Sequence, residues 1–400
     1  MPSNNLRTMS WATLTNTIGS GLWTAAQALY FTRIVGMPAV QVGAAITIAN
    51  LVGLASSVPL GRIADRRDPR MIRAGIQALQ ALVAVTYVTV GSFWPLLLVT
   101  TLDSGLQTAN IVVRAALVAA VGGAKGRVRA YAVLRVVAAI GMAVGAGAAA
   151  IAVAFDTAMA YHVLIAVNAA TYLLSSVLLL RLPAFQPEPK PADAAGHSAM
   201  RDARFLGVSV GSAVVALHRG VLPILVPLWI VQHTAAPKVA ISLVLVVNTA
   251  VSIVVTVPAS RRLTSAAAGA RGMRWAGLLL GVSMVLYSLA TFGSAGAAVG
   301  VLIGATTIYA IGELLYATSN VTLSYELAAP GAIGDYQGTN NLITGVAFAV
   351  SPLLMTAVVL RAPDAGGWFG LAVAFAVAGA VVPAMTRRAA GRVVPAVAES

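Results

Sequence analysis

The chain contains no cysteine among its 400 residues. Disulfide bonds and thiolate metal centres are therefore excluded, and the redox compartment cannot be deduced from the sequence. Charged residues are also scarce, at 10% of the chain. The Gly-x-x-x-x-Gly-Lys-Ser/Thr loop of ATP-driven proteins is missing. No nucleophile triad or cluster of metal ligands stands out, so the sequence predicts neither an enzyme nor a bound cofactor or metal.

Apolar residues take the place of the missing charge. They make up 59% of the chain, and the mean hydropathy is +0.87, whereas a soluble domain is about 45–50% apolar. Twelve apolar segments approach the roughly 20 residues that a spanning helix needs. We therefore predict an all-α membrane protein with twelve transmembrane helices in two pseudo-symmetric six-helix bundles. The predicted spans are residues 11–35, 40–60, 74–90, 94–121, 130–155, 160–180, 205–231, 239–257, 273–292, 297–327, 337–360 and 368–384.

Basic residues are distributed unevenly between the two sides of this predicted topology. Twenty of the 26 lie in the tails, in the central linker and near the loops that follow even-numbered spans; the opposite loops hold only Arg33, Lys238 and Arg361. The positive-inside rule then places both termini in the cytoplasm. The basic excess needs no nucleic-acid partner. Because arginine far outnumbers lysine and alanine is abundant, we expect a bacterial inner (cell) membrane protein.

A long polar stretch, residues 182–203, divides the chain. It is rich in Pro and Ala with mixed charge, and we interpret it as a flexible cytoplasmic linker between domains 1–181 and 204–400. The halves resemble each other: Ser57-Val58-Pro59 is echoed 199 positions later by Thr256-Val257-Pro258. Transporters built from parallel repeats of this kind place their binding site near mid-membrane, between the repeats.

The densest charge lies in residues 61–73, between two apolar segments. Here Gly61-x-x-x-Asp65-Arg66-x-x-x-Arg70 resembles the loop signature of the major facilitator superfamily between its second and third helices. The stretch Gly312-Glu313-Leu314-Leu315, followed by Asp335-Tyr336-Gln337-Gly338, is similar to a pattern in bacterial drug-efflux members. The helix-five run Gly141-x-x-x-Gly145-Ala146-Gly147 lacks the proline of the antiporter signature. The resemblance implies secondary transport by alternating access.

Asp65 has two interpretations. We predict that it faces the cytoplasmic start of helix eleven, near residues 336–338, where free amides and the helix dipole stabilise a carboxylate, while Gly61 permits close approach. Similar residues in the family stabilise the outward-facing state, and we favour this role for Asp65. The alternative is a solvated loop that only sets topology. We assign the gate to Gly61, Asp65, Arg66 and Arg70, with Arg114 and Arg135 in the inner thirds of helices four and five; those two could instead snorkel to the interface.

Two acidic residues are candidates for proton coupling. Glu313 lies near the middle of helix ten in an apolar context, and Asp103 lies in the outer half of helix four. Burial favours the neutral form of a carboxylic acid, which a proton carrier requires. The alternative for each is a structural hydrogen bond to a neighbouring helix.

Four residues are candidates for the substrate cavity: Arg219, His218, Asn16 and Trp23. An intramembrane arginine should face a cavity or a carboxylate. Pairing with Glu313 or Asp103 is therefore the alternative for Arg219, and packing is the alternative for Trp23.

Three functions are compatible with these residues. The first is proton-coupled efflux of a hydrophobic or amphiphilic small molecule, such as a drug or natural product, by a monomer in a lipid bilayer. The second is proton-coupled or facilitative transport of a polar metabolite, which would require a more polar cavity. The third, a non-transporting membrane receptor or scaffold, would not need the buried charges or the gate loop.

Overall fold

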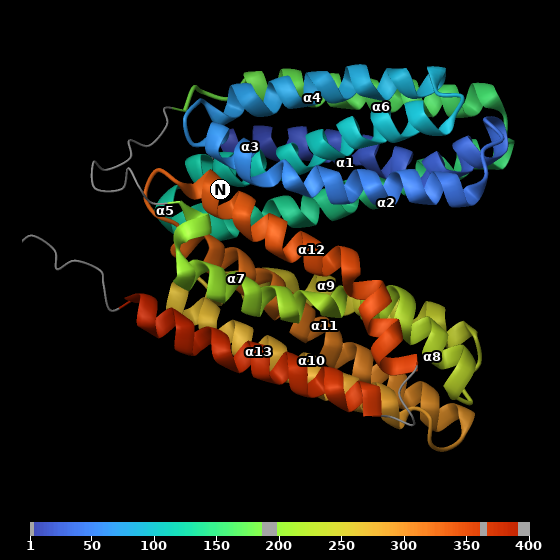
Figure 1. Cartoon of the computed structure of the whole chain (residues 1–400), viewed down its shortest axis with the longest axis vertical. Coiled ribbons are helices and arrows are strands. Elements are labelled where there is room, and N and C mark those ends of the chain that lie inside the picture. The colour runs from blue at the N-terminus through green and yellow to red at the C-terminus, as the bar shows by residue number, and fades with distance from the viewer. Residues whose placement is uncertain (1–3, 186–197, 361–365, 391–400) are drawn as a thin grey trace, which may run out of the picture. The chain divides into compact units, whose positions relative to one another are not determined.

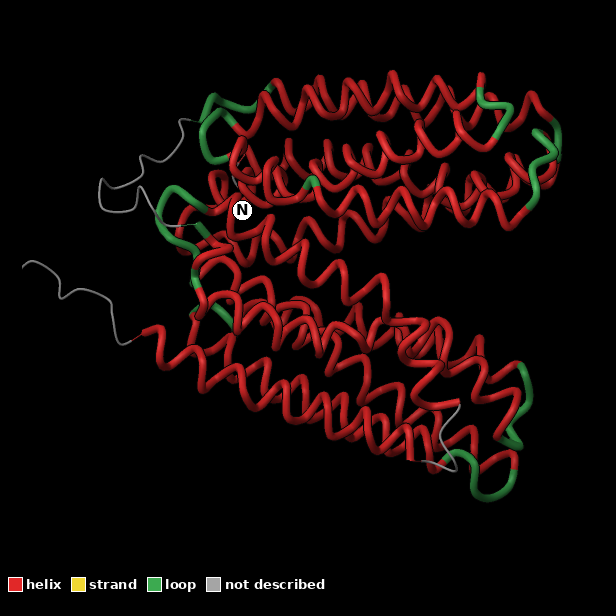
Figure 2. Tube along the Cα trace, viewed as in Figure 1, coloured by secondary structure: helices red, strands yellow, loops and turns green. Residues whose placement is uncertain are grey.

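The computed structural model describes residues 4–185, 198–360 and 366–390. All regular structure in these ranges is helical, as Figure 2 shows by colour, so the predicted all-α fold is confirmed. Each of the twelve predicted spans coincides with one helix or with a short series of helices.

The chain forms two compact units. The first comprises residues 1–196 together with 329–342, and the second comprises residues 197–328 and 343–400. The predicted linker at residues 182–203 falls at the division, although its residues 186–197 lie outside the described part of the chain. Sequence reasoning had assigned residues 329–342 to the second bundle, whereas their contacts group them with the first unit.

In the first unit, α1 packs against α5 and α6, α4 packs against the same two helices, and α2 packs against α5 (Figure 1). Buried aromatic side chains near the end of α1 and hydroxyl and amide groups along α4 and α5 fill the interior. The helices are α1 (Asn4–Leu29) with its π-helical extension Tyr30–Ile34, α2 (Ala39–Ala55), α3 (Ser57–Ala64), α4 (Pro69–Thr86), α5 (Phe93–Phe155) and α6 (Ala158–Leu180).

Two local breaks shape the first unit. Helices α2 and α3 form a pair bent by 42°. Pro59 cannot donate a backbone hydrogen bond, and this favours a break about one turn earlier, at Ser56. Helix α5 contains two spans, Phe93–Gly123 and Gly126–Phe155. Gly123 lies between them with a φ of 59°, a left-handed conformation that glycine adopts without steric cost.

In the second unit, α10 packs against α11 and α13, α11 also packs against α9, and α13 packs against α7. The interior holds large aromatic side chains, including Trp229, Tyr287 and Trp368. The helices are α7 (Ala203–Ala216), a 3-10 turn (Leu217–Gly220), a π-helical turn (Val221–Leu225), α8 (Val226–His233), α9 (Val239–Arg262), α10 (Ala266–Leu289), α11 (Ala295–Glu326), α12 (Ile333–Leu360, whose first residues belong to the first unit) and α13 (Gly366–Ala390).

Among the described residues, eight helices are long and apolar enough to cross a membrane, or up to ten if each bent pair counts as one span. Helix α1 is not among them, because hydroxyl and amide side chains such as Thr13, Asn16 and Thr17 make it polar. Helix α9 contributes only the shorter apolar stretch Val239–Ser252.

Candidate functional site

Glycines bring α3 and the start of α12 into direct backbone contact within the first unit. A Cβ atom added at Gly61 would overlap the carbonyl oxygen of Gly334, and one added at Gly334 would overlap that of Gly61. Gly338 lies in the same way against the carbonyl of Ser57. Small residues allow helix backbones to approach closely, so these three glycines fix the register of the contact.

Asp65 contributes to this contact by accepting hydrogen bonds from α12. Its carboxylate receives hydrogen bonds from the backbone N–H groups of Gly334 at 2.5 Å and Asp335 at 2.9 Å. These are free amides of the first turn of α12, where the helix dipole favours negative charge. Arg62 adds an ion pair with Asp335, with Nε 2.8 Å from Oδ1. The expected contact of Asp65 with the start of this helix is therefore present. It lies earlier than residues 336–338, because the helix begins at Ile333 rather than at residue 337.

The two arginines assigned to the gate, Arg66 and Arg70, have different surroundings. Arg70 bonds to Asp68 at 3.2 Å and donates to the backbone carbonyl of Leu182 at 2.7 Å. It therefore ties the start of α4 to the end of α6. The side chain of Arg66 is exposed. The gating role of the whole group stays a prediction.

Arg73 is a correction to the sequence analysis, which placed it at the end of the charged loop. The structure puts it inside α4 with no exposed surface, and its Nε donates to Oδ1 of Asn110 on α5 at 2.9 Å. The sequence did carry a signal for this, because Asp68-Pro69 is a helix start: Asp68 caps the N-terminus and Pro69 occupies the first turn. With the helix starting there, Arg73 lies in its second turn.

The amide groups around Arg73 form a buried polar cluster. Gln77 donates to the same Oδ1 of Asn110 at 3.4 Å, and the amide of Asn110 donates to Asn16 on α1 at 3.4 Å. Within the described residues, Arg73 NH1 and the Nδ2 of Asn16 have no hydrogen-bond partner. The structure thus places Asn16 among buried polar groups inside the first unit.

Trp23 lies in an aromatic cluster near the end of α1. Its ring centroid is 4.7 Å from that of Tyr87 and 6.1 Å from those of Tyr30 and Phe31, and its side chain is buried. Trp23 thus packs against other aromatic side chains inside the first unit, as in the alternative to a role in the substrate cavity. It does not pack toward lipid.

The side chain of Asp103 is half-buried and accepts a hydrogen bond. The hydroxyl of Tyr87 donates to its carboxylate at 3.2 Å, and the Gln80 amide also lies close to it. Arg114 and Arg135 are both half-buried and belong to none of the ion pairs of the described residues. Arg114 is near enough to Arg73 for their like charges to interact.

The seventh predicted span, residues 205–231, is broken at its middle into α7 and α8; we call this span helix seven. Its continuous apolar sequence did not reveal the break. Pro223 and Pro227 lack the backbone N–H that a regular helix needs, and helical turns of other pitch separate α7 from α8. Ser351 on α12 satisfies the freed groups: its hydroxyl accepts from the N–H of Gly220 at 2.9 Å and donates to the carbonyl of Leu217.

His218 and Arg219 lie at this break and point to different surroundings. His218 is buried against the rings of Tyr309 and Tyr316, at 5.7 and 5.0 Å, and its Nδ1 is 2.6 Å from the Val215 carbonyl. Arg219 is exposed, with its guanidinium carbon 5.6 Å from the ring centroid of Phe348. The pairing of Arg219 with a carboxylate is not found among the described residues.

Glu313 lies on α11 on the same face as Tyr309 and Tyr316, which are four residues before it and three after it. The side chain is half-buried. Within the described part of the chain it accepts no hydrogen bond and forms no ion pair. Its charge is close enough to act on the hydroxyls of Tyr309 and Tyr287, and Arg219 also acts on Tyr309. Tyr309 in turn donates to the backbone carbonyl of His218 at 2.9 Å, which links Glu313 to the broken helix.

Among the described residues, no group of three or more His, Asp or Glu side chains lies close enough together to hold a metal ion. The arrangement offers instead one carboxylic acid without a hydrogen-bond partner beside a helix break, and a second carboxylate that clasps a helix N-terminus. Such groups can bind protons or cations and can stabilise one conformation over another.

Comparison with known proteins gives consistent results. The sequence model described as "Major Facilitator Superfamily" matches residues 9–352. No curated protein matches the chain. Among solved structures, a bacterial homologue of the iron transporter ferroportin is similar with a TM-score of 0.72 and 15% identity, covering 97% of this chain and 100% of that one. The human organic anion transporter MFSD10 (TETRAN) has a TM-score of 0.71 and 16% identity, with coverage of 94% and 98%. The nucleoside transporter NupG has a TM-score of 0.52 and 14% identity, with coverage of 96% and 100%.

Proposed function

The chain belongs to the major facilitator superfamily and is a multi-pass membrane transporter rather than an enzyme; from this premise we propose that it expels a hydrophobic or amphiphilic small molecule in exchange for protons. The fold alone does not choose the substrate, because a shared fold hosts many functions. The similar solved structures illustrate this, since their names refer to iron, organic anions and nucleosides.

The observation that carries the proposal is the state of Glu313. Each of the six aspartates that the structure describes takes part in a hydrogen bond or an ion pair. Glu313 accepts none, although it lies in the middle of a spanning helix. An ionisable residue in such a place is expected to serve transport, because its burial is costly. We propose that Glu313 binds and releases the coupling proton and that Asp103 is secondary.

The substrate is proposed to contact the second unit near the break in helix seven. Arg219 is exposed there and lies over Phe348, so a cationic group and an aromatic ring are presented together. An arginine at this depth requires a water-filled cavity or a partner. His218, Asn16 and Trp23 are more buried, and a direct role for them in the cavity stays a prediction.

The gate is proposed to be the contact between Asp65 and the start of α12. Alternating access needs a contact that is made in one state and lost in the other, so that a ligand or proton can shift the populations. A carboxylate on two helix amides is a strong contact that can break as a unit. We propose that the protein acts as a monomer in a bacterial inner membrane with both termini in the cytoplasm; reporter fusions after Arg181 and at the C-terminus should both report a cytoplasmic position.

Transport of a polar metabolite is the second candidate. One observation favours it: the first unit gathers more buried polar groups than the sequence suggested, around Arg73, Gln77 and Asn110, and some of their atoms have no described partner. A polar solute could bind to such groups. We rank it second because most of these groups bond to one another.

Proton release on substrate binding tests the proposal. Purified protein in weakly buffered detergent solution should release protons when a hydrophobic cation such as ethidium is added, because the dye and the proton compete for Glu313. Glu313→Gln should bind the dye without releasing protons. Proton release by Glu313→Gln equal to that of the wild type would show that Glu313 does not take part in coupling. Proton exchange itself would be contradicted if the rate of dye counterflow in proteoliposomes did not change when a pH gradient was imposed.

A further inference from the structure

A surface cavity of about 350 Å³ lies in the second unit, at the end of the helices where the arginine distribution predicts the cytoplasmic boundary. Its walls come from the end of α9, the first half of α10 and the middle of α11. The lining residues are Val255, Arg262, Leu263, Ala268, Arg271, Gly272, Trp275 and Leu315.

The cavity has two chemically different parts. Arg262 ends α9 and Arg271 lies in the second turn of α10, so both guanidinium groups are near the boundary. Both side chains are exposed, and neither forms an ion pair with any described residue. The remaining lining is apolar, with Val255 from α9, Leu263 from the turn that follows α9, and Leu315 from α11.

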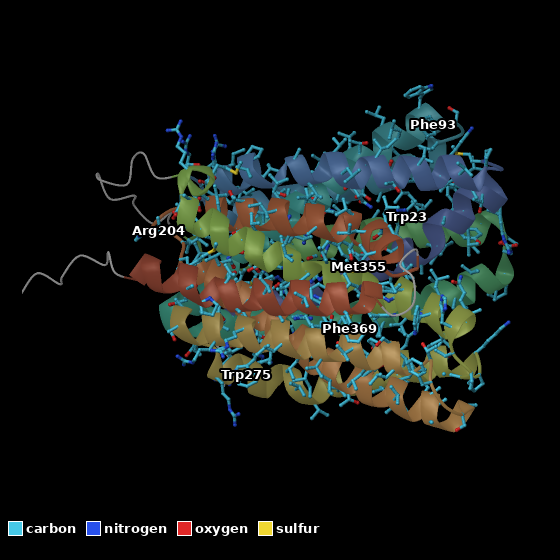
Figure 3. The ribbon with its side chains drawn as sticks, turned by 60° about the horizontal axis from the view of Figure 1, so that its bottom comes forward. Trp23, Phe93, Arg204, Trp275, Met355 and Phe369 are labelled. Atoms are coloured by element: carbon cyan, nitrogen blue, oxygen red, sulfur yellow. The ribbon has the colours of Figure 1, made fainter. Side chains whose placement is uncertain are left out.

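The apolar part reaches into the hydrocarbon region. Leu315 lies about 16 Å before the cytoplasmic end of α11, at the helical rise of 1.5 Å per residue. Trp275, which Figure 3 labels on α10, is one turn beyond Arg271 and is 59% exposed. Tryptophan is typical of the membrane interface. The cavity therefore extends from headgroup level to acyl-chain level.

Contacts between α9, α10 and α11 hold the walls of the cavity in place. Thr322 on α11 donates to the backbone carbonyl of Leu263 at 2.8 Å, which fixes the turn between α9 and α10. Ser265 caps the N-terminus of α10 by accepting from the N–H of Ala268 at 3.3 Å. A Cβ atom at Gly272 would overlap Ser319 Oγ, so α10 lies tightly against α11. A ligand would thus meet a preformed site.

We propose that this cavity binds one anionic phospholipid of the cytoplasmic leaflet, with the phosphate between Arg262 and Arg271 and an acyl chain along Val255, Leu263 and Leu315. Basic pockets between transmembrane helices on the cytoplasmic side are suited to such headgroups. A free phosphate would leave the apolar half of the cavity in water. A zwitterionic lipid carries its own cation, so two arginines without a described carboxylate favour a net negative headgroup. Neither Glu313 nor any residue assigned to the gate lines this cavity.

Native mass spectrometry of the full-length protein in detergent tests the site, with phosphatidylglycerol added as the probe and phosphatidylcholine or inorganic phosphate added in parallel. The variant Arg262→Gln/Arg271→Gln should bind phosphatidylglycerol about 30-fold more weakly, which is the effect expected for two arginines near an anionic membrane surface. The matched control is Arg201→Gln/Arg204→Gln, which removes the same charge from exposed positions of the same unit that do not line the cavity.

The outcomes separate the possibilities. Selective loss in the Arg262/Arg271 variant, with the control unchanged, supports the proposal. A second variant, Trp275→Ala, keeps both arginines and should also weaken phosphatidylglycerol binding, whereas inorganic phosphate should not compete. Equal loss in both double variants, equal binding of phosphatidylcholine, or full displacement by phosphate would overturn the proposal. Unchanged elution on size exclusion and an unchanged melting temperature in detergent without added lipid show that each variant is folded.

Discussion

The carboxylates of the two units differ in their surroundings. In the first unit each described acidic side chain accepts a hydrogen bond: Asp65 from two helix amides, Asp68 from Arg70, Asp103 from Tyr87, Asp156 from Arg33 and Tyr161, and Asp335 from Arg62. In the second unit Asp202 accepts hydrogen bonds from the N–H groups of Arg204 and Phe205, whereas Glu313, deep in a spanning helix, accepts none from the described residues. A paired carboxylate stabilises a structure, whereas an unpaired one in the membrane must exchange protons or bind a ligand to be tolerated. On this difference rests the proposal that Glu313, rather than Asp103, carries the coupling proton.

The largest effect is expected when proton-coupled transport is compared between the variants Glu313→Gln and Asp103→Asn. A glutamine imitates the protonated state permanently, so transport driven by a pH gradient should be abolished, while exchange at equal pH on both sides should survive. Asp103→Asn should retain most of the gradient-driven rate, because its carboxylate is engaged by Tyr87. The measurement is dye transport in proteoliposomes with and without the gradient. Equal loss in both variants would mean that the hydrogen bond does not remove Asp103 from coupling.

Asp65→Asn probes a paired carboxylate whose partner is a helix N-terminus. Hydrogen bonds to a charged group contribute about 1.5–3 kcal/mol each, so losing the charge should weaken the closed contact enough to slow transport roughly tenfold. Dye binding to the detergent-solubilised protein should be unchanged, because Asp65 lies at the loop. Asp156→Asn is the matched control, since its ion pair with Arg33 is solvent-exposed and contributes little. A normal transport rate in Asp65→Asn would leave the loop with a topological role only.

Ser351→Ala asks how much the broken helix of the second unit depends on a side chain. The change leaves the buried N–H of Gly220 without its acceptor, at a cost of about 1–3 kcal/mol in the free energy of unfolding. Thermal unfolding in detergent should report the loss as a lower melting temperature. Ser209→Ala on α7 serves as a control, because its buried hydroxyl has no described partner and its removal should cost nothing. Similar melting temperatures for the two variants would show that Ser351 does not support the break.

The smallest effect is expected for Tyr87→Phe, which makes Asp103 resemble Glu313 by removing its donor. A hydrogen bond to a charged group contributes about 1.5–3 kcal/mol, and the lower end of this range is expected here because the Gln80 amide stays close to Asp103. We expect a slightly lower melting temperature and no change in proton coupling. Tyr30→Phe controls for the altered aromatic cluster, since the Tyr30 hydroxyl makes no hydrogen bond in the described structure. New proton release in Tyr87→Phe, absent from Tyr30→Phe, would show that a lost partner is sufficient to recruit Asp103.

Several features were readable from the sequence because their cause is local. The contact of Asp65 with the following half was expected from the motif and from the close approach that Gly61 permits. Helix starts marked by a cap were also legible: Asp68-Pro69 predicts that α4 begins there, and neglect of that signal placed Arg73 in the loop. The break in helix seven had its signal in Pro223 and Pro227, which the strong apolar pattern of residues 205–231 concealed.

The sequence by itself determined the membrane class, the all-α fold, the unequal distribution of arginines and the family motif. Each depends on the free energy of moving a side chain between water and lipid, or on residues close together in the chain. Short stretches of sequence are therefore sufficient to predict these features. Only the tertiary structure decided which polar groups have partners. Gly220 and Ser351 are 131 positions apart, and Arg73 and Asn110 are 37 apart on different helices. Such pairs depend on helix rotation and packing, which hydropathy does not specify, and for that reason Glu313 could be recognised as unpaired only once the helices were in place.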